Sequence, residues 1–278
     1  MEVNVLSSRL VKPAYTAGEV PMPATEYIPL SIFDRVTFEM QMAIIYAFAP
    51  PAPTTASIEK GLATVLAQYR AFAGQLGESP DGTSSASEGR GRPFSRFETI
   101  LAHLWRTMTR ARDLSPEETS KIRLSVDGRH RLGQPAEYFG NMVLWAFPRS
   151  TVGDLLNRPL KHAAQVIHDE VARVDGAYFQ SFVDFASSGA AEKEGLARSA
   201  VCKDAHCPDV EVDSWLTFPF YELDFGTGSP SYFMPAYFPT EGMLFLAPSN
   251  FGDGSVDAFV PVFEHNLQAF KECCHSME

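Results

Sequence analysis

A polar, glycine-rich segment interrupts the first third of this sequence. Glu78–Arg92, with the sequence ESPDGTSSASEGRGR, consists mostly of small and charged residues and has no apolar periodicity. A segment of this composition is typical of a surface loop or linker. We therefore divide the chain into residues 1–77, a flexible junction at residues 78–92, and residues 93–278.

The part before the junction carries one strand pattern and one helix pattern. Apolar residues occupy every second position from Val36 to Tyr46, which predicts a strand with one buried face. The prolines from Pro50 to Pro53 end this strand, because proline cannot donate to a sheet ladder. Apolar residues then recur at helical spacing from Ile58 to Tyr69, which predicts a helix with Ser57 as its N-cap and Glu59 in its first turn.

The part after the junction opens with a strong helix signal. Ser95 and Glu98 have the spacing of a capping box, in which each side chain satisfies a backbone amide of the other residue. Behind them, one apolar stripe is formed by Phe97, Leu101, Leu104, Trp105 and Met108.

Further helices and strands are expected towards the end of the chain. A third helix should start near Thr151 and bury apolar residues from Leu160 to Val174. A last helix over Glu264–Cys274 should turn Phe263, Leu267 and Phe270 inward. Strands are expected at Trp215–Tyr221, Met243–Ala247 and Ser255–Val260, which are rich in aromatic residues and punctuated by Gly and Pro. Helices and strands intermix, so the predicted class is α/β, or mixed α+β sheets with flanking helices.

The charge balance of the chain is acidic. The formal charge is −11 at pH 7 and the pI is about 5.1. Nucleic-acid binding requires clustered Lys and Arg, so this composition argues against such a partner. No stretch approaches the ~18 apolar residues of a membrane span, and the N-terminus lacks the apolar core of a secretory signal. We expect a cytoplasmic protein with no membrane partner.

The cysteines suggest neither disulfides nor a metal site. Four cysteines in 278 residues do not form a disulfide framework. Cys202, His206, Cys207 and the Cys273–His275 run could be considered as zinc ligands. Their C-x4-C spacing is loose, however, and adjacent cysteines rarely both ligate one metal. We expect no metal.

Five stretches carry family motifs in the right order. They are Leu30–Asp34 (LSIFD, for LSxxD), Leu62–Leu76 (LATVLAQYRAFAGQL, for LxxxLxxYPxxAGRL), Ser95–Arg112 (SRFETILAHLWRTMTRAR, for SxFExLxAHxWRxxxRAR), Val126–Arg131 with Tyr138–Asn141 (VDGRHR and YFGN, for VNxRxR and YxGN), and Ser214–Gly228 (SWLTFPFYELDFGTG, for a segment ending in DFGWG). Together they resemble the plant BAHD acyl-CoA-dependent acyltransferases. The sequence is most similar to cereal members that transfer hydroxycinnamoyl or benzoyl groups to amines.

The resemblance implies a two-domain α/β fold, like that of chloramphenicol acetyltransferase, with acyl-CoA and acceptor entering a tunnel from opposite ends. It implies acyl-CoA as a co-substrate and no permanently bound cofactor. The chain departs from the family in two ways. None of its seven histidines has an aspartate four positions later, so the catalytic HxxxD histidine is missing. The chain is also short, and the deficit falls between Leu76 and Ser95, where most of the first domain's sheet belongs. Residues 1–77 are then a remnant of that domain.

The DFGWG-like motif has a structural role in the family. The resemblance implies that Asp224 pairs with the arginine that aligns with Arg129 and lies away from the thioester. We therefore predict an ion pair between Asp224 and Arg129. Phe225 belongs to the same motif, and Gly226 and Gly228 are expected to serve a turn with unusual dihedral angles.

Other residues are candidates for ligand contacts. Trp215 and Thr217 are expected at the acceptor pocket, and Thr217 stands where shikimate-using members have an arginine. Threonine offers no bidentate cationic fork, so it disfavours a carboxylate-bearing acceptor. An amine such as tryptamine, tyramine or agmatine, or a neutral alcohol, fits better. Arg129, Arg131 and Lys121 are candidates for CoA contacts, with solvated surface charge as the alternative.

Two functions remain open at this point. The chain is an aromatic acyltransferase that acts on an amine and is impaired by its shortening, or it is a catalytically inactive relic that binds CoA or a partner protein. Loss of strands from one domain would also expose strand edges and apolar faces, which predicts self-association.

Overall fold

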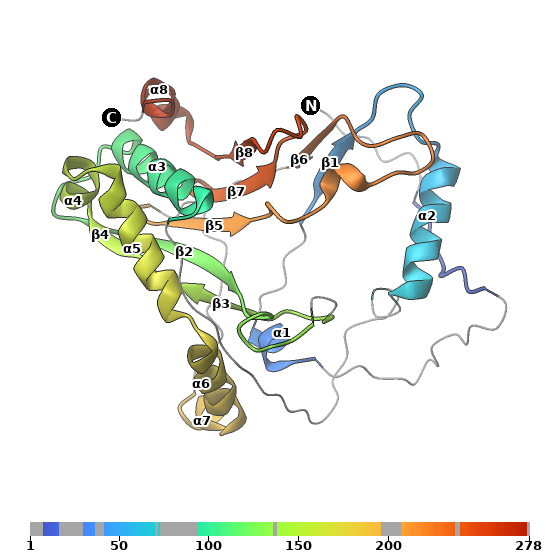
Figure 1. Cartoon of the computed structure of the whole chain (residues 1–278), viewed down its shortest axis with the longest axis horizontal. Coiled ribbons are helices and arrows are strands. Elements are labelled where there is room, and N and C mark those ends of the chain that lie inside the picture. The colour runs from blue at the N-terminus through green and yellow to red at the C-terminus, as the bar shows by residue number, and fades with distance from the viewer. Residues whose placement is uncertain are drawn as a thin grey trace. The chain divides into compact units, whose positions relative to one another are not determined.

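The structure is a computed structural model that describes residues 8–16, 30–36, 42–69, 72, 94–135, 138–195, 207–236 and 240–276 (Figure 1). The chain forms two compact units. Unit 1 comprises Met1–Pro29, Ile45–Gly82 and Pro219–Met234, and unit 2 comprises Leu30–Ile44, Thr83–Phe218 and Pro235–Glu278. Both units combine distant segments of sequence. The junction predicted at Glu78–Arg92 lies outside the described residues, and the proposed roles of residues 1–77 and 93–278 stay predictions.

Unit 2 is built on a mixed sheet, to which the described residues contribute six strands. In sheet order these are β3 (Val143–Ala146), β2 (Thr119–Asp127), β5 (Val210–Ser214), β7 (Met243–Pro248) and β8 (Val256–Phe259), while β4 (Arg149–Thr151) also pairs with β2. The three central strands β2, β5 and β7 run parallel, and the outer strands run antiparallel to their neighbours. The mixed α/β class predicted from the sequence is confirmed.

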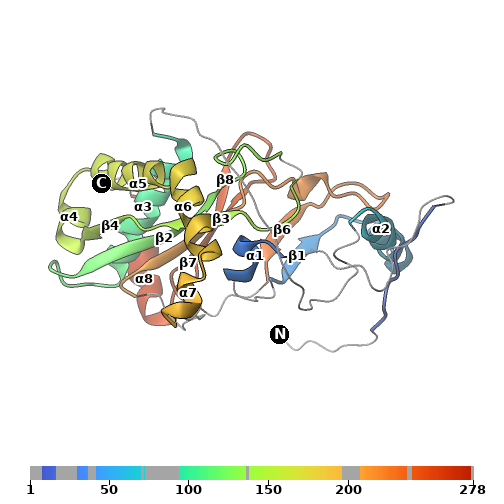
Figure 2. The ribbon, with the colours of Figure 1, turned by 90° about the horizontal axis from the view of Figure 1, so that it is seen from below.

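The described part of unit 2 also contains seven helices. They are α1 (Ile32–Val36), α3 (Arg96–Ala111), α4 (Val152–Asn157), α5 (Leu160–Arg173), α6 (Gly176–Ser187), α7 (Ala190–Lys193) and α8 (Glu264–Cys273). Helices α3 and α5 pack on each other and lie on the same side of β2 (Figures 1 and 2). The sheet residues that join their core alternate along each strand, as in Ile122, Leu124 and Val126 of β2.

Helix α3 is the central helix of unit 2. Its capping box forms as predicted, with the Ser95 hydroxyl accepting from the Glu98 amide and the Glu98 carboxylate accepting from the Ser95 amide. Trp105 is fully buried on its apolar stripe, and the indole Nε1 donates to the Ser120 hydroxyl at 2.8 Å. The buried ring therefore leaves no unsatisfied donor.

The LSxxD-like segment docks onto unit 2. Phe33 of α1 is buried, and its ring centroid lies 5.8 Å from that of Phe179 and 5.6 Å from that of Phe182. The Asp34 carboxylate accepts from the backbone amide of Asn141 at 2.7 Å. Two motifs that are more than a hundred residues apart in sequence thus meet at Asp34, which gives the aspartate of the first motif a structural function.

A buried ion pair connects three parts of unit 2. The Arg112 Nε donates to the Glu241 carboxylate at 2.8 Å, and both side chains are 2% exposed. Arg112 also donates to the Asp209 carbonyl, just before β5, and Glu241 accepts from the Phe263 amide at the start of α8. Burial alone would raise the pKa of Glu241, but the hydrogen bonds from Phe263, Arg112 and Asn266, together with the Arg112 charge, lower it overall.

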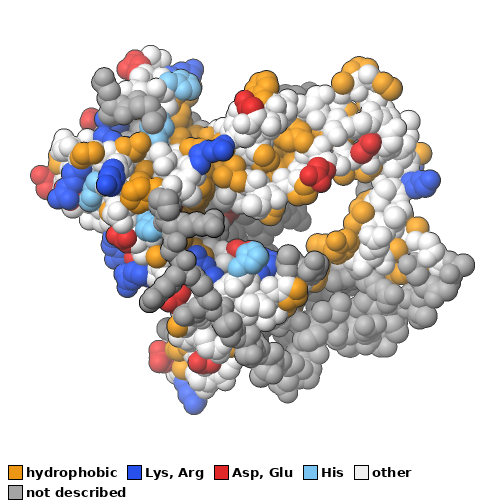
Figure 3. All heavy atoms as spheres, viewed as in Figure 1, with side chains coloured by type: hydrophobic (Ala, Val, Ile, Leu, Met, Phe, Trp, Pro, Cys, Tyr) orange, Lys and Arg blue, Asp and Glu red, His pale blue; other side chains and the backbone are white. Residues whose placement is uncertain are grey.

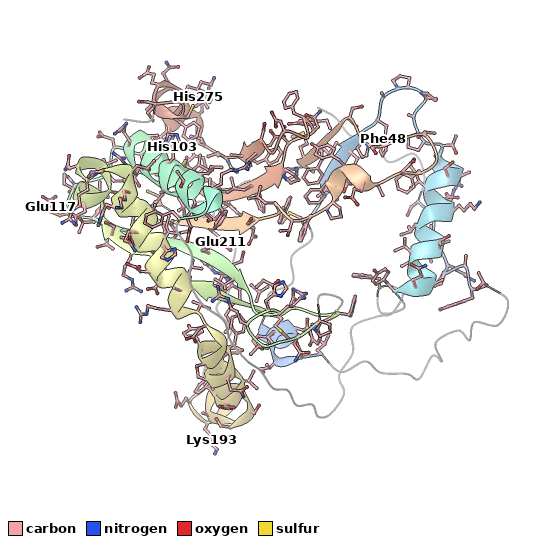
Figure 4. All side chains as sticks on the ribbon, in the orientation of Figure 1. Phe48, His103, Glu117, Lys193, Glu211 and His275 are labelled. Atoms are coloured by element: carbon pink, nitrogen blue, oxygen red, sulfur yellow. The ribbon has the colours of Figure 1, made fainter. Side chains whose placement is uncertain are left out.

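Unit 1 has a small aromatic centre. Strand β1 (Ile44–Ala47) pairs with β6 (Tyr232–Pro235), and the 3-10 helix η2 (Phe220–Glu222) and α2 (Thr55–Gln68) complete its described elements. The Phe220 and Phe233 rings stack 3.7 Å apart at 9°, and Tyr46 lies 5.4 Å from Phe233. Nearby, Phe48 (Figure 4) lies 6.2 Å from Phe225 of the DFGWG-like motif.

Several local predictions need correction. The N-cap of α2 is Thr54 rather than Ser57, because the Thr54 hydroxyl accepts from the Ser57 amide. The helix expected from Thr151 is two helices, because Pro159 lacks the amide that a continuous helix would use. Trp215–Tyr221 is not a strand: β5 ends at Ser214, and turns and η2 follow.

The strand expected over Val36–Tyr46 is much shorter. Val36 ends α1 and residues 37–41 lie outside the described residues, while β1 spans Ile44–Ala47. Strands Met243–Pro248 and Val256–Phe259 and the closing helix α8 are confirmed.

The buried face of α8 was predicted only in part. Phe270 packs against the core as expected, whereas Phe263 and Leu267 are each 37% exposed. Helix α8 contacts α3 through the side that carries Phe270 and Cys273, so Phe263 and Leu267 lie at its rim.

The Arg112–Glu241 pair provides a stability test. Glu241→Ala leaves the Arg112 charge buried without its partner and should lower the free energy of unfolding by about 3–5 kcal/mol. Replacing both residues with methionine should cost less than Glu241→Ala, because no charge stays buried. Urea unfolding followed by tryptophan fluorescence measures these differences. Arg173→Ala is the control, since it breaks an ion pair in which Arg173 is 78% exposed, and should cost about 1 kcal/mol or less. Equal costs for Glu241→Ala and Arg173→Ala would contradict the assigned role.

Candidate functional site

The Ser214–Gly228 stretch passes from one unit to the other. Trp215 and Thr217 belong to unit 2, and Asp224, Phe225 and the motif glycines belong to unit 1. The residues predicted for the acceptor pocket and those of the structural motif therefore have separate surroundings, which are described in turn.

Asp224 organises the turn that follows it. Its Oδ1 atom accepts from the backbone amides of Gly226, Thr227 and Gly228 at 2.7, 3.0 and 2.9 Å. The glycines have φ angles of 93° and 98°, which residues with a side chain rarely adopt, so the predicted glycine turn is present. The amides of Gly226, Gly228 and Thr227 lower the pKa of Asp224 because they stabilise its ionised form.

Phe225 attaches this turn to α2. A Cβ atom built at Gly61 would lie 3.0 Å from the Phe225 ring, so glycine at position 61 allows the ring to approach the helix closely. On its other side the ring meets Phe48. The motif thus joins the aromatic centre of unit 1 to its helix.

Arg129 has its own partners in unit 2. Its guanidinium donates to the Asp127 carboxylate at 3.1 Å and to the Gly140 carbonyl at 2.8 Å. These bonds hold the VDGRHR and YFGN segments together. The predicted ion pair between Arg129 and Asp224 stays a prediction, because the two residues belong to different units and each has partners in its own.

Trp215 extends the sheet beyond β5. Its amide donates to the Leu246 carbonyl at 2.7 Å, and its ring centroid lies 4.7 Å from that of Phe245 on β7. Thr217 is exposed two residues further on. Both residues therefore follow the carboxyl end of a central parallel strand, which is where α/β sheets commonly bind ligands.

The sheet face opposite α3 and α5 carries a polar cluster. Strand register places Arg123 beside Glu211 and Ser125 beside Trp145, and Asp213 follows Glu211 on the same face of β5. The Arg123 guanidinium donates to both Glu211 carboxylate oxygens at 3.2 Å and lies 4.4 Å from the Trp145 ring centroid. The face therefore already holds one guanidinium between a carboxylate and an aromatic ring (Glu211 is labelled in Figure 4).

Asp213 differs from Glu211 in its partners. Burial raises the pKa of Asp213 above the ordinary value, opposed by a hydrogen bond from Ser125 and by the Arg123 charge. Burial also raises the pKa of Glu211, but here the Arg123 charge opposes it most strongly. Arg123 donates hydrogen bonds to Glu211, whereas the hydrogen bond at Asp213 comes from Ser125.

Sequence reasoning missed this cluster. The signal is the segment Val210–Ser214 (VEVDS), in which apolar and acidic residues alternate within a central strand. Such alternation normally indicates a strand with one buried and one solvated face. Here Glu211 is only 7% exposed, so its charge is buried rather than solvated.

The three cationic CoA candidates all have protein partners. The Lys121 ammonium lies 3.2 Å from the Asp209 carboxylate and its side chain is 49% exposed. Arg131 donates to the Val171 carbonyl near the end of α5 at 3.2 Å, and burial lowers its pKa. With Arg129 bound to Asp127 and Gly140, Lys121 is the most accessible of the three, and CoA binding by any of them stays a prediction.

Two further sequence features can be placed. Within the described residues, no group of three His, Cys, Asp or Glu side chains could hold a metal ion, and Cys202 and His206 lie outside those residues. None of the helices in the described part of the chain has the length and apolar character needed to cross a membrane.

The Asp224 turn should depend on pH. Because the pKa of Asp224 is lowered in the folded state, its stabilisation is present at neutral pH and is lost as pH falls through that lowered value. Amide exchange by NMR should therefore become faster at Gly226, Thr227 and Gly228 in Asp224→Ala at neutral pH. Glu222→Ala, an exposed neighbour, is the control. Unchanged exchange in Asp224→Ala would mean that the glycines alone hold the turn.

Asp213 should show the opposite pH dependence. An acid with a raised pKa binds its proton more tightly when folded, so its contribution favours folding at low pH and is lost as pH rises through the raised value. Asp213→Asn should therefore raise the Tm at pH 7–8. It should have no effect below about pH 3, where aspartic acids are protonated in both states. Asp184→Asn on the exposed side of α6 is the control, and a lower Tm for Asp213→Asn at pH 7–8 would contradict the assignment.

Comparison with known proteins identifies the family. The sequence model of the Transferase family matches residues 81–277. Putrescine hydroxycinnamoyltransferase 3 of Oryza sativa subsp. japonica is 53% identical over 437 positions, which cover 100% of each chain. Agmatine coumaroyltransferase-1 of Hordeum vulgare is 52% identical over 196 residues, covering 69% of this chain and 45% of that protein.

A crystal structure shows the same fold. F. sporotrichioides TRI101 complexed with coenzyme A and T-2 matches with a TM-score of 0.56 and 22% identity, covering 65% of this chain and 42% of that one. This chain thus spans less than half of the solved structure that it matches. Its length also differs from that of the rice relative, since 278 residues are aligned over 437 positions and 159 positions have no residue of this chain. With the motifs in order and the family model matching most of its length, the chain belongs to the Transferase family of BAHD acyltransferases.

Proposed function

We propose that this chain comes from an enzyme that transfers an aromatic acyl group, hydroxycinnamoyl or benzoyl, from CoA to an amine, and that the shortened chain is impaired in this reaction. The observation that carries the proposal is the 53% identity, spanning both chain ends, with a protein named putrescine hydroxycinnamoyltransferase 3. The name of the barley relative, an agmatine coumaroyltransferase, points to the same chemistry. Acyl-CoA is the co-substrate, no cofactor is bound permanently, and the protein acts in the cytoplasm.

The reaction requires a base. The amine nitrogen attacks the thioester carbonyl, a C–N bond forms, the C–S bond breaks, and the amine proton ends on the CoA thiol. A positioned histidine suits this proton transfer because its pKa lies near neutral pH. The sequence has no HxxxD histidine. Its loss typically costs about 10²–10⁴-fold in rate, so we expect slow turnover.

The polar cluster favours a particular kind of amine. Putrescine and agmatine each carry a second basic group that does not react and stays cationic at neutral pH. Asp213 offers this cation a carboxylate that the neutral Ser125 hydrogen-bonds, and Trp215 and Phe245 provide aromatic rings on the same face. Tryptamine and tyramine lack a second cation. The cluster therefore favours diamines and guanidino amines, and Thr217 disfavours carboxylate-bearing acceptors.

The second candidate function is a non-catalytic one. It is favoured by the missing histidine together with the 159 alignment positions that have no residue here. In that case the chain retains at most a CoA contact, for which Lys121 is the most exposed candidate, or acts through a protein partner. Residues 93–278 would then be the retained C-terminal domain and residues 1–77 the remnant.

Product analysis distinguishes these functions. The purified chain is incubated with p-coumaroyl-CoA or benzoyl-CoA and with agmatine, putrescine, tryptamine, tyramine or shikimate, and conjugates are measured by mass spectrometry. We expect amides of agmatine and putrescine in preference to the other products, at a rate about 10²–10⁴-fold below that of the full-length rice relative. Asp213→Asn should reduce the agmatine and putrescine products more than the tryptamine product.

The controls decide between the outcomes. Tryptophan fluorescence must show that each sample is folded. Shikimate ester at the same rate as the amides would contradict the acceptor assignment. If no product forms, calorimetric titration with CoA follows: binding that Lys121→Ala weakens would support the non-catalytic function, and no binding would exclude a retained CoA contact.

A further inference from the structure

Helix α2 presents an apolar face to solvent. Ile58, Leu62, Val65 and Tyr69 recur at helical spacing and are 40–52% exposed, and Phe72, whose ring lies 6.3 Å from that of Tyr69, is 67% exposed. We refer to these five residues as the α2 face. Apolar side chains are visible on α2 in the space-filling view (Figure 3). In a soluble domain a stripe of this kind normally faces a core.

The contacts of α2 come from other sides of the helix. Phe225 lies against Gly61, and the Ala14 amide donates to the Ala63 carbonyl at 2.9 Å. A helix of 14 residues is marginal by itself in water and depends on tertiary packing. The elements described in unit 1 therefore hold α2 in place but leave its apolar stripe uncovered.

Unit 1 also has very little core of its own. Among the described residues, its buried apolar side chains are Ala67 and Phe233, whereas the others belong to unit 2. Its sheet in the described residues has two strands, and Ile45 on β1 is 44% exposed. A two-stranded sheet is marginally stable unless more strands or a helix cover it. The described part of unit 1 therefore has too few buried apolar residues and strands to be stable by itself.

The comparison with the rice relative shows how much of that protein has no counterpart in this chain. Both ends of the two chains align, so the 159 positions without a counterpart are internal. We propose that the α2 face is a docking surface for this internal segment of a full-length family member, supplied as a separate polypeptide. This proposal rests on family membership and on the exposed surface, and it does not require the chain to catalyse acyl transfer.

A second copy of this chain fits the surface less well. It would present the same α2 face and the same short sheet, and so would lack the same half of the core. The internal segment consists of positions of the rice relative that this chain lacks, so unlike a second copy it can add residues that unit 1 does not have. Self-association is therefore the main competing outcome of the test.

Co-expression tests the proposal. The full chain carries an affinity tag and is co-expressed with the internal segment of the rice relative, the 159 positions absent here. We expect the segment to co-purify, and light scattering to give the mass of a one-to-one complex. Hydrogen exchange measured by mass spectrometry should show slower exchange in Thr55–Gln68 within the complex than in the chain alone.

Matched variants locate the interface. Leu62→Asp places a charge on the α2 face and should reduce the recovered complex at least about tenfold, since an unpaired charge is costly to bury. Thr64→Asp changes an exposed residue of the same helix outside this face and should leave recovery unchanged. All three tryptophans lie in unit 2, so their fluorescence shows that unit 2 is unaffected by either variant.

Three results would overturn the proposal. In the first, the soluble tagged chain does not capture the segment. In the second, the Leu62→Asp variant captures as much segment as the unchanged chain. In the third, the chain alone forms a dimer that does not bind the segment and that Leu62→Asp dissociates. The mass of the complex tests the docking proposal, and product analysis of amine conjugates tests the proposed function. Failure of one proposal can therefore be distinguished from failure of the other.

Discussion

Unit 2 depends on a buried ion pair at the end of its central helix. Arg112 completes the RAR sequence of α3, and through Glu241 and the Asp209 carbonyl it fixes the start of α8 and the approach to β5. Further hydrogen bonds of Arg112 and Glu241 offset part of the cost of removing both charges from water. Hydrophobic packing of α3 and α5 supplies most of the burial, but it is non-directional. The ion pair determines that the start of β5 and the start of α8 meet at the end of α3.

The sequence predicted the elements whose signals are local. The capping box at Ser95 and the stripe behind it predicted α3, and apolar runs bounded by Gly and Pro predicted β7 and β8. Strand β2 was not predicted, although Ile122, Leu124 and Val126 alternate with the polar residues Arg123 and Ser125. Aromatic residues in Trp215–Tyr221 suggested a strand, yet they pack as a turn and a short helix whose conformation is set by tertiary contacts.

The candidate site was predictable only through motifs. The motif containing Asp224 predicted a structural turn, and the structure shows its chemistry: one carboxylate oxygen accepts from three successive amides. Pairing over long distances was not predictable. Arg123 and Glu211 are 88 residues apart and meet only through the parallel register of β2 and β5, so no local pattern indicates that they pair.

The division of the chain has a consequence for how it can be taken apart. Leu30–Ile44 belongs to unit 2 although it precedes most of unit 1, and Pro219–Met234 belongs to unit 1 although unit 2 surrounds it in sequence. A protease that cuts the backbone near residue 85 would therefore release no independent piece, because Phe33 would still anchor the N-terminal fragment in the core formed by the other. A single cut at that place therefore does not separate unit 1 from unit 2, and a genetic truncation there would remove part of both.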